Sequence, residues 1–212
     1  MSKIWMLRPK PHNIPRMREF LENNIIAIGW PEITSLVGKT RGEIKEALKN
    51  HPLNYSPNEL GIATATVSLF VNDFRIGDIV VVPDGDNIYF CRIISEYFYD
   101  ATKASQSEGY PHQHSVEWIK GPVKRDDIPE ALRGSLRAPR TAADISHHNK
   151  IITEFLGLNE EQEKSELTTD EEYVVFEYPI RLDATSTIRI PKNITQTEAS
   201  RLGDYVKTLY FS

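Results

Sequence analysis

Short apolar runs that end in turn residues recur along the chain. Residues 79–82 form one such run, which ends in Pro83-Asp84-Gly85-Asp86, and residues 89–94 form the next. Two runs joined by a tight turn are typical of consecutive antiparallel strands. Comparable runs occupy residues 3–8, 25–28 and 116–119. The pattern therefore predicts a central β-sheet that contains all five segments.

Apolar residues at helical spacing separate the predicted strands. Pro15 suits the first turn of a helix that ends near Asn24, and Thr40 and Ser56 each start a capping box. We expect the two capped helices to cover one face of the sheet. A third capping box, Thr141-Ala-Ala-Asp144, predicts that another helix begins there.

The last 55 residues have a different character from the rest of the chain. Residues 158–172 are acidic, which is typical of a linker. In residues 173–180 and 187–190 apolar and polar residues alternate, which predicts two strands. Thr195-Gln-Thr-Glu198 then opens a last helix. We therefore predict a main domain over residues 1–157, a linker over 158–172 and a small ββα module over 173–212. Because so small a module has little core, we expect it to dock on the main domain or on a partner.

The composition is that of an ordinary soluble protein, with 40% apolar and 26% charged residues among 212. No apolar run approaches the ~20 residues of a membrane span, so we predict a cytoplasmic protein with no membrane partner. Cys91 is the only cysteine, which excludes an internal disulfide, and its strand pattern predicts a buried thiol. Residues 1–157 hold 19 basic and 19 acidic residues, and the net charge of −5 lies entirely beyond them. A neutral main domain argues against nonspecific coating of nucleic acid but permits a local basic face.

Two features of the main domain suggest ligand binding. Trp30 stands between Gly29 and Pro31 at the end of a predicted strand, which either presents the indole to a ligand or plugs the edge of the core. Arg133, Arg137 and Arg140 precede the predicted helix at Thr141. Guanidinium groups beside a helix N-terminus would suit a phosphate, although arginines on a solvated face are the alternative.

The chain lacks the common signatures of catalysis. It has no Gly-rich phosphate loop, no nucleophile elbow and no paired-cysteine metal spacing. A metal site of His112 and His114 with His147 and His148 is a weak alternative, because no carboxylate or thiol stands at a fitting spacing. We therefore predict a binding protein rather than an enzyme, without a cofactor or a metal.

An ordered set of short motifs indicates a family. These are Trp5 in the first strand, Ile28-Gly-Trp30, Gly77-Asp-Ile-Val, Phe90-Cys-Arg-Ile, His114-Ser-Val-Glu-Trp118-Ile and Leu136-Arg-Ala-Pro-Arg-Thr141. Together they resemble the PUA-like superfamily, in particular its EVE and YTH branch and the EVE-like readers of modification-dependent restriction systems. The resemblance covers about residues 3–157. It implies an α+β fold in which helices flank a mixed, strongly curved β-sheet or partial barrel.

The resemblance also implies a site. In the YTH branch a Trp after the second strand forms one wall of an aromatic cage, and Trp30 matches this position. Tyr110 is the nearest candidate for a second wall, with Tyr97 and Tyr99 behind it, and Trp5 completes the predicted pocket. A basic residue of the family that holds phosphate corresponds to Arg137 or Arg140, and Arg133 and Arg8 are further candidates for backbone contacts. The chain departs from the YTH pattern because its loop lacks a second Trp.

From this resemblance we predict a reader that flips a modified base of DNA into an aromatic pocket in a bacterial defence system. The small C-terminal module, which resembles units appended to varied bacterial proteins, would recruit an effector. An RNA-binding protein and a protein-interaction or regulatory subunit remain alternatives. The sequence leaves the modification, the strandedness of the target and the oligomeric state open.

Overall fold

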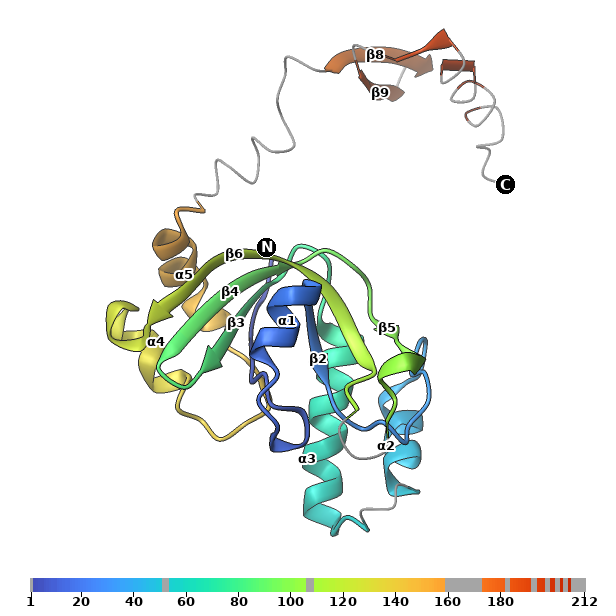
Figure 1. The fold of residues 1–212 in the computed structure, drawn as a ribbon. Helices are drawn as coiled ribbons and strands as arrows, with labels where there is room; N and C mark the ends of the chain where they lie inside the picture. The colour runs from blue at the N-terminus through green and yellow to red at the C-terminus, as the bar shows by residue number, and fades with distance from the viewer. Residues whose placement is uncertain are drawn as a thin grey trace. The chain divides into compact units, whose positions relative to one another are not determined.

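The protein is described by a computed structural model over residues 2–50, 54–105, 109–158, 173–181, 184–191, 194–196, 199–200, 203 and 206. Contacts within the chain divide it into two compact units, Met1–Gly157 and Leu158–Ser212. The first unit carries the larger sheet and the helices that flank it (Figure 1). Each unit is described by itself below.

The sheet of the first unit has the strand order β2-β6-β4-β3-β1-β7, with β5 beside β6. Its strands are β1 (Ile4–Leu7), β2 (Ile25–Ile28), β3 (Ile79–Asp84), β4 (Asn87–Ile93), β5 (Phe98–Tyr99), β6 (His112–Lys124) and β7 (Ala142–Asp144). β1 pairs with β3 in parallel, and the other neighbours are antiparallel. The sheet is therefore mixed, and it curls into a half-barrel (Figure 1).

Helices flank this sheet, which confirms the predicted α+β class. They are α1 (Met17–Asn23), α2 (Arg41–Lys49), α3 (Pro57–Ser68), α4 (Glu130–Ser135) and α5 (Asn149–Leu156). A π-helical turn, Leu69–Asp73, continues α3, and 3-10 turns precede α1 and α5. The predicted strands at residues 25–28 and 79–94 and the helix after Pro15 form where the apolar pattern places them.

Alternating residues of the strands face two layers of core. Trp5 of β1 belongs to the core that contains Phe20 of α1, Ile44 of α2 and Val67 of α3. As predicted, the two capped helices therefore cover the same face. The neighbouring β1 residues are also fully buried but lie outside that cluster, and Phe90 of β4 packs against Phe155 of α5 at 5.6 Å between ring centroids. Side chains alternate across a sheet, so α5 covers the opposite face.

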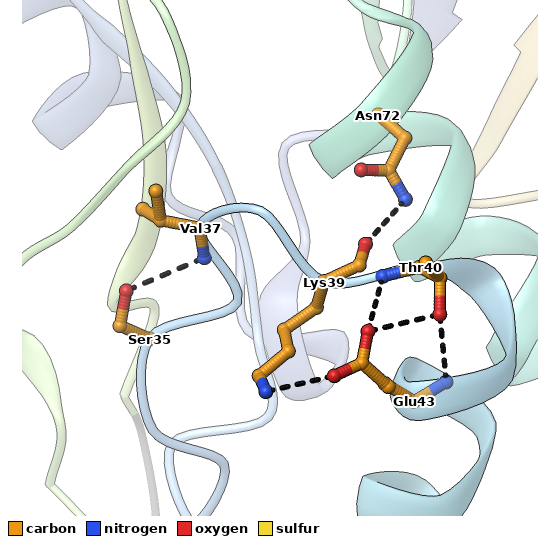
Figure 2. Close-up of polar contacts among 6 residues, drawn as sticks. All are labelled: Ser35, Val37, Lys39, Thr40, Glu43 and Asn72. Atoms are coloured by element: carbon orange, nitrogen blue, oxygen red, sulfur yellow. Dashed lines mark hydrogen bonds and ion pairs between the residues drawn. The ribbon is translucent and has the colours of Figure 1, made fainter.

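The predicted capping box at Thr40 forms at the start of α2 (Figure 2). Thr40 Oγ1 accepts a hydrogen bond from the backbone N–H of Glu43, and the Glu43 carboxylate accepts from the backbone N–H and the hydroxyl of Thr40, each at 2.9 Å. Lys39 Nζ donates to the same carboxylate at 2.9 Å. These donors, with the Thr40 backbone first, lower the pKa of Glu43 to about 2. Asn72 Nδ2 donates to the Lys39 carbonyl at 3.2 Å, which ties the cap to the π-helical turn.

The predicted helix start at Thr141 is wrong. Residues 142–144 form the edge strand β7, which pairs with β1, and α5 begins only at Asn149. Asp144 Oδ1 accepts from the backbone N–H of Ser146 at 2.8 Å, so the acidic residue stabilises a turn rather than a helix start. β6 continues beyond the apolar run at residues 116–119 as far as Lys124, which pairs with Asn87 of β4.

The second unit contains the two predicted strands. β8 (Tyr173–Arg181) and β9 (Ala184–Pro191) form an antiparallel hairpin. Most of the predicted linker over residues 158–172 and most of the helix predicted from Thr195 lie outside the described residues.

Candidate functional site

A cavity of about 210 Å³ lies at the end of β2, and Trp30 forms part of its wall. Residues from four separate segments of the chain line it. Its principal side chains are Arg8, Lys10, His12, Trp30, Tyr55 and Thr141. The cavity is smaller than the ~300–1,000 Å³ of a typical site for a drug-sized ligand, so its size suits one small flat group.

Trp30 is half-buried and fixed at both ends. Its indole Nε1 donates to the hydroxyl of Tyr55 at 2.9 Å, and its carbonyl accepts from the backbone N–H of Ile33 at 3.1 Å. The same carbonyl accepts from His112 Nε2 at 3.2 Å. The aromatic pair Trp30 and Tyr55 is therefore held beside the cavity, and both side chains also pack against the hydrophobic core.

Left-handed backbone is concentrated around this cavity. Trp30 has a φ of 64°, and His12 and Asn13, which also line the cavity, have φ values of 54° and 62°. Asn54, next to Tyr55, has a φ of 45°. A bulky residue such as Trp rarely adopts positive φ, and such strained residues cluster at functional sites. The strain at Trp30 marks this cavity as the best candidate site in the described part of the chain.

His12 lies against Gly29 and bonds to the carbonyl of Gly109, two glycines whose own surroundings leave no room for a Cβ. A Cβ at Gly29 would lie 2.8 Å from His12 Nε2, so the ring packs directly on the backbone at the end of β2. His12 Nε2 donates to the carbonyl of Gly109 at 3.0 Å. A Cβ at Gly109 would itself lie 2.5 Å from the Lys103 carbonyl oxygen. Both positions therefore require glycine for close approach.

Arg8 connects the cavity to the arginine-rich segment. Its guanidinium donates to the carbonyls of Leu136, Ala138 and Arg140 at 3.2, 2.9 and 3.2 Å. Arg8 therefore positions the segment before β7, in addition to lining the cavity. Lys10, which is exposed, brings a further positive charge to the same cavity.

The three predicted phosphate arginines do not sit at a helix N-terminus, because residues 142–144 form a strand. Arg133 of α4 donates to the carbonyls of Ile128 and Asp126, so its guanidinium is engaged by the backbone just before that helix. Arg137 and Arg140 are exposed, but neither lines the cavity beside Trp30. The helix dipole that supported the predicted phosphate seat is therefore missing.

Trp5 was predicted to line the pocket, and this prediction is wrong. The indole is fully buried and stacks on Phe74 with 4.9 Å between ring centroids. Its Nε1 donates to the buried carboxylate of Asp78 at 2.7 Å. A buried indole N–H needs an acceptor, and Asp78 provides it inside the core.

The three predicted tyrosines lie elsewhere. Tyr97 is buried and its hydroxyl bonds His112 Nδ1 at 2.7 Å, whereas Tyr110 is buried and donates to the carboxylate of Glu19. Burial is the main cause that raises the pKa of each phenol to about 12. Tyr99 is half-buried on β5 with its ring 5.4 Å from that of His112. Among the residues that the structure describes, Trp30 pairs with Tyr55 instead of with these tyrosines.

Sequence reasoning did not find Tyr55, Lys10 or His12. Tyr55 directly precedes the Ser56 cap, and His12 stands in a proline-flanked turn, so neither belongs to a periodic pattern. The signal that could have indicated Tyr55 is a lone aromatic just before a helix start. Lys10 carries no signal of its own.

His112 and His114 belong to the core rather than to a metal site. His112 Nε2 donates to the Trp30 carbonyl, and burial lowers the pKa of His112 to about 4. His114 places Nε2 2.9 Å from the Phe70 carbonyl and Nδ1 3.2 Å from the Ser95 carbonyl. Over the described ranges, no group of three His, Cys, Asp or Glu residues is arranged to hold a metal ion. Cys91 is buried, as predicted, and burial raises the pKa of its thiol.

No helix in the part of the chain that the structure describes is long and apolar enough to span a membrane. No curated protein matches the chain, and no solved structure matches it. A family model described as a domain of unknown function, DUF8426, matches residues 5–139. This match spans the sheet from β1 to β6, the helices α1 to α4, and Trp30 with most of its cavity. The chain therefore belongs to the DUF8426 family.

Proposed function

We propose that this protein is a non-catalytic reader of nucleic acid, which accepts one extruded, modified base of DNA beside Trp30. One observation carries the proposal: a strained, half-buried Trp30 forms the wall of a small cavity that also holds Tyr55 and Lys10. In this proposal the base stacks on the indole, and the sugar-phosphate chain passes on the side of Lys10 and Arg8. The proposal includes membership of the PUA-like superfamily, with an EVE- or YTH-like site.

The charges around the cavity support this orientation. Lys10 and Arg8 bring positive charge to one part of it, whereas Glu32 and Glu59 lie close enough to Tyr55 to raise the pKa of its phenol, after the larger effect of burial. Phosphate would be repelled from the Tyr55 side and attracted to the Lys10 side. An uncharged base edge is the part of a nucleotide that suits the environment of Tyr55.

The expected free energies predict a modest affinity for the extruded base and a preference for the modified over the unmodified base. Extrusion of a base from a duplex costs a few kcal/mol, and stacking on an aromatic side chain returns about 1–3 kcal/mol. Burial of one additional methyl group contributes roughly 0.8 kcal/mol, which corresponds to about a fourfold preference. Lys10 and nearby arginines would supply a salt-dependent part of the affinity.

The biological setting belongs to the same proposal. The protein would act in the cytoplasm as part of a bacterial defence or restriction-type system. Its C-terminal module would contact an effector. Recognition and cleavage would then reside in different proteins.

The test compares matched modified and unmodified oligonucleotides, as single and double strands, for the wild-type chain, Trp30→Ala and Trp118→Ala. Fluorescence anisotropy gives each affinity. Trp118 is a matched control because it is also a half-buried indole but packs on Tyr89, away from the cavity. We expect Trp30→Ala to lower affinity for the modified strand at least tenfold and Trp118→Ala to leave it nearly unchanged.

Other outcomes would contradict the proposal. Equal affinities for modified and unmodified DNA in all three proteins would exclude base reading. Stronger binding to matched RNA oligonucleotides, still dependent on Trp30, would assign the cavity to an RNA reader. Absence of binding to both nucleic acids would favour an interaction or regulatory subunit. Circular dichroism of each variant shows whether the fold is retained.

A further inference from the structure

A second hollow, of about 900 Å³, lies between α3 and the segment that leads into β7. Ala142, Ala143 and Asp144 of β7 line one side, and Ile62 and Ala65 of α3 with Leu69 of the π-helical turn line the other. We call it the α3–β7 groove. It is distinct from the cavity beside Trp30, although Thr141 borders both.

One side of the groove is an unpaired strand edge. β7 is the last strand of the sheet and pairs only with β1 in the described sheet. The Arg8 backbone N–H donates to the Thr141 carbonyl at 2.8 Å, and the Ile145 N–H donates to the Ile4 carbonyl at 2.9 Å. Residues of an antiparallel pair face the partner alternately, so the backbone groups of Ala142 and Asp144 face away from β1. Asp144 is exposed, and Ala142 borders the groove although its side chain belongs to the core, so these are the backbone groups that a further extended strand would pair with.

The opposite wall supplies an apolar surface for the side chains of such a strand. Ile62 is 62% exposed, whereas Ala63 and Val67 of the same helix are buried in the core. Ala65 is exposed and Leu69 is half-buried beside it. An extended segment on β7 would direct alternate side chains toward this apolar wall.

The charges of the groove distinguish a polypeptide from a nucleic acid. Arg41 and Arg140 line it, but so do Asp73 and Asp144, and all four are exposed. A phosphodiester chain would meet as many negative as positive groups, so it would gain little attraction. A peptide can place an acidic residue beside the arginines and a basic residue beside the aspartates.

We propose that the α3–β7 groove binds an extended segment of a partner polypeptide, which adds one antiparallel or parallel strand to the sheet at β7. The segment carries apolar residues at alternate positions and mixed charges at its ends. This site is independent of base reading, and its ligand adds to the main domain itself rather than to the C-terminal module.

The test first selects, from a displayed library of random 12-residue peptides, those that bind the full-length protein. The affinity of each enriched peptide is then measured for the wild type and for two variants of the protein. Ile62→Glu places a charge on the groove wall, and Ile76→Glu makes the same change at a position that is 56% exposed but outside the groove. We expect at least a tenfold loss of affinity for Ile62→Glu and less than a twofold change for Ile76→Glu. Trp30→Ala should leave peptide affinity unchanged, so a failure of base reading would not be mistaken for a failure of this proposal.

A second experiment tests the strand pairing directly: each backbone amide of an enriched peptide is N-methylated in turn, and the affinity of each methylated peptide is measured. A strand paired with β7 uses every second backbone N–H, so we expect large losses at alternate positions only. Losses at three- and four-residue spacing, or no losses, would overturn the strand model. The proposal also fails if no selected peptide distinguishes the two isoleucine variants. It fails equally if Ile62→Glu weakens binding of single-stranded DNA or RNA, because the groove would then belong to nucleic acid.

Discussion

His112 Nε2 donates a hydrogen bond to the backbone carbonyl of Trp30 at 3.2 Å, across 82 residues of sequence. The other ring nitrogen accepts from the Tyr97 hydroxyl at 2.7 Å, and that hydroxyl accepts from the Leu36 N–H at 3.2 Å. A carbonyl can only accept, so the Trp30 contact requires the proton on Nε2 of the neutral ring. These three hydrogen bonds hold the Trp30 carbonyl in place, and with it the left-handed backbone conformation of Trp30.

The neutral state of His112 predicts a pH dependence of stability. Burial lowers the pKa of His112 in the folded state to about 4, against 6.5 for an unburied histidine. The unfolded state therefore binds more protons between these values, and the free energy of unfolding falls as pH decreases from 6.5 to 4. The expected loss is about 3 kcal/mol for this group. Urea unfolding followed by circular dichroism at several pH values would measure it.

A variant separates this histidine from the carboxylates that also titrate at low pH. His112→Gln should lower stability at pH 7 but flatten its decline between pH 6.5 and 5. Thr34→Gln, at an exposed position without a titratable side chain, should leave the wild-type slope. If both variants decline in parallel with the wild type, His112 is not buried in the neutral form.

Local signals were sufficient for most elements of the first unit. The strand at residues 25–28 forms because apolar residues continue until Gly29, and α2 and α3 begin where Thr40 and Ser56 supply side-chain acceptors. β7 was missed because nothing in its three residues favours a strand. Its conformation depends on pairing with β1, which lies more than 130 residues away.

The candidate site was predictable only in part. Trp30 could be predicted because Gly29 and Pro31 end the apolar pattern of the strand on either side of it. The rest of the cavity is assembled from segments distant in sequence, so no spacing connects Trp30 with Tyr55, Lys10 or Arg8. Trp5 was misplaced for the same reason, since its acceptor, Asp78, lies 73 residues away.

Asp78 is predicted to be a principal determinant of stability. Its Oδ1 accepts from the Lys3 N–H at 2.8 Å, and its Oδ2 accepts from Trp5 Nε1 at 2.7 Å and the Arg75 N–H at 3.0 Å. In Asp78→Asn, the new side-chain NH2 group would face one of these N–H groups, and two donors cannot form a hydrogen bond with each other. Chemical denaturation should show a loss of about 3 kcal/mol, because a buried group loses its partner. Asp127→Asn, at an exposed position, should change stability by less than about 0.5 kcal/mol. Similar losses in both variants would contradict the role given to Asp78.

The capping box shown in Figure 2 predicts a smaller effect. Thr40→Ala removes the hydroxyl that accepts from the Glu43 N–H at the start of α2. The expected decrease in the free energy of unfolding is about 1 kcal/mol. Thr34→Ala is the control, since Thr34 is also exposed but lies outside a helix. Equal free energies of unfolding for Thr40→Ala and the wild type would show that the cap does not contribute to stability.

Gly29→Ala is predicted to displace His12 from the cavity beside Trp30. The new Cβ would lie 2.8 Å from His12 Nε2, so the ring must move and its hydrogen bond to the Gly109 carbonyl breaks. The expected loss of stability is about 1 kcal/mol. Gly61→Ala provides the opposite control: a Cβ there meets no atom within 4 Å, so the substitution within α3 should raise stability by about 0.5–1 kcal/mol.

The contact between Gly29 and His12 can be isolated by a double-mutant cycle. His12→Ala removes the ring that the new methyl group would strike, so Gly29→Ala should cost little in that background. The two single losses should therefore exceed the loss in the double variant, whereas independent sites would give additive losses. Additivity would mean that His12 does not pack on Gly29. If the cavity reads a base, Gly29→Ala should also weaken binding of the modified oligonucleotide, because the displaced ring would occupy space beside Trp30.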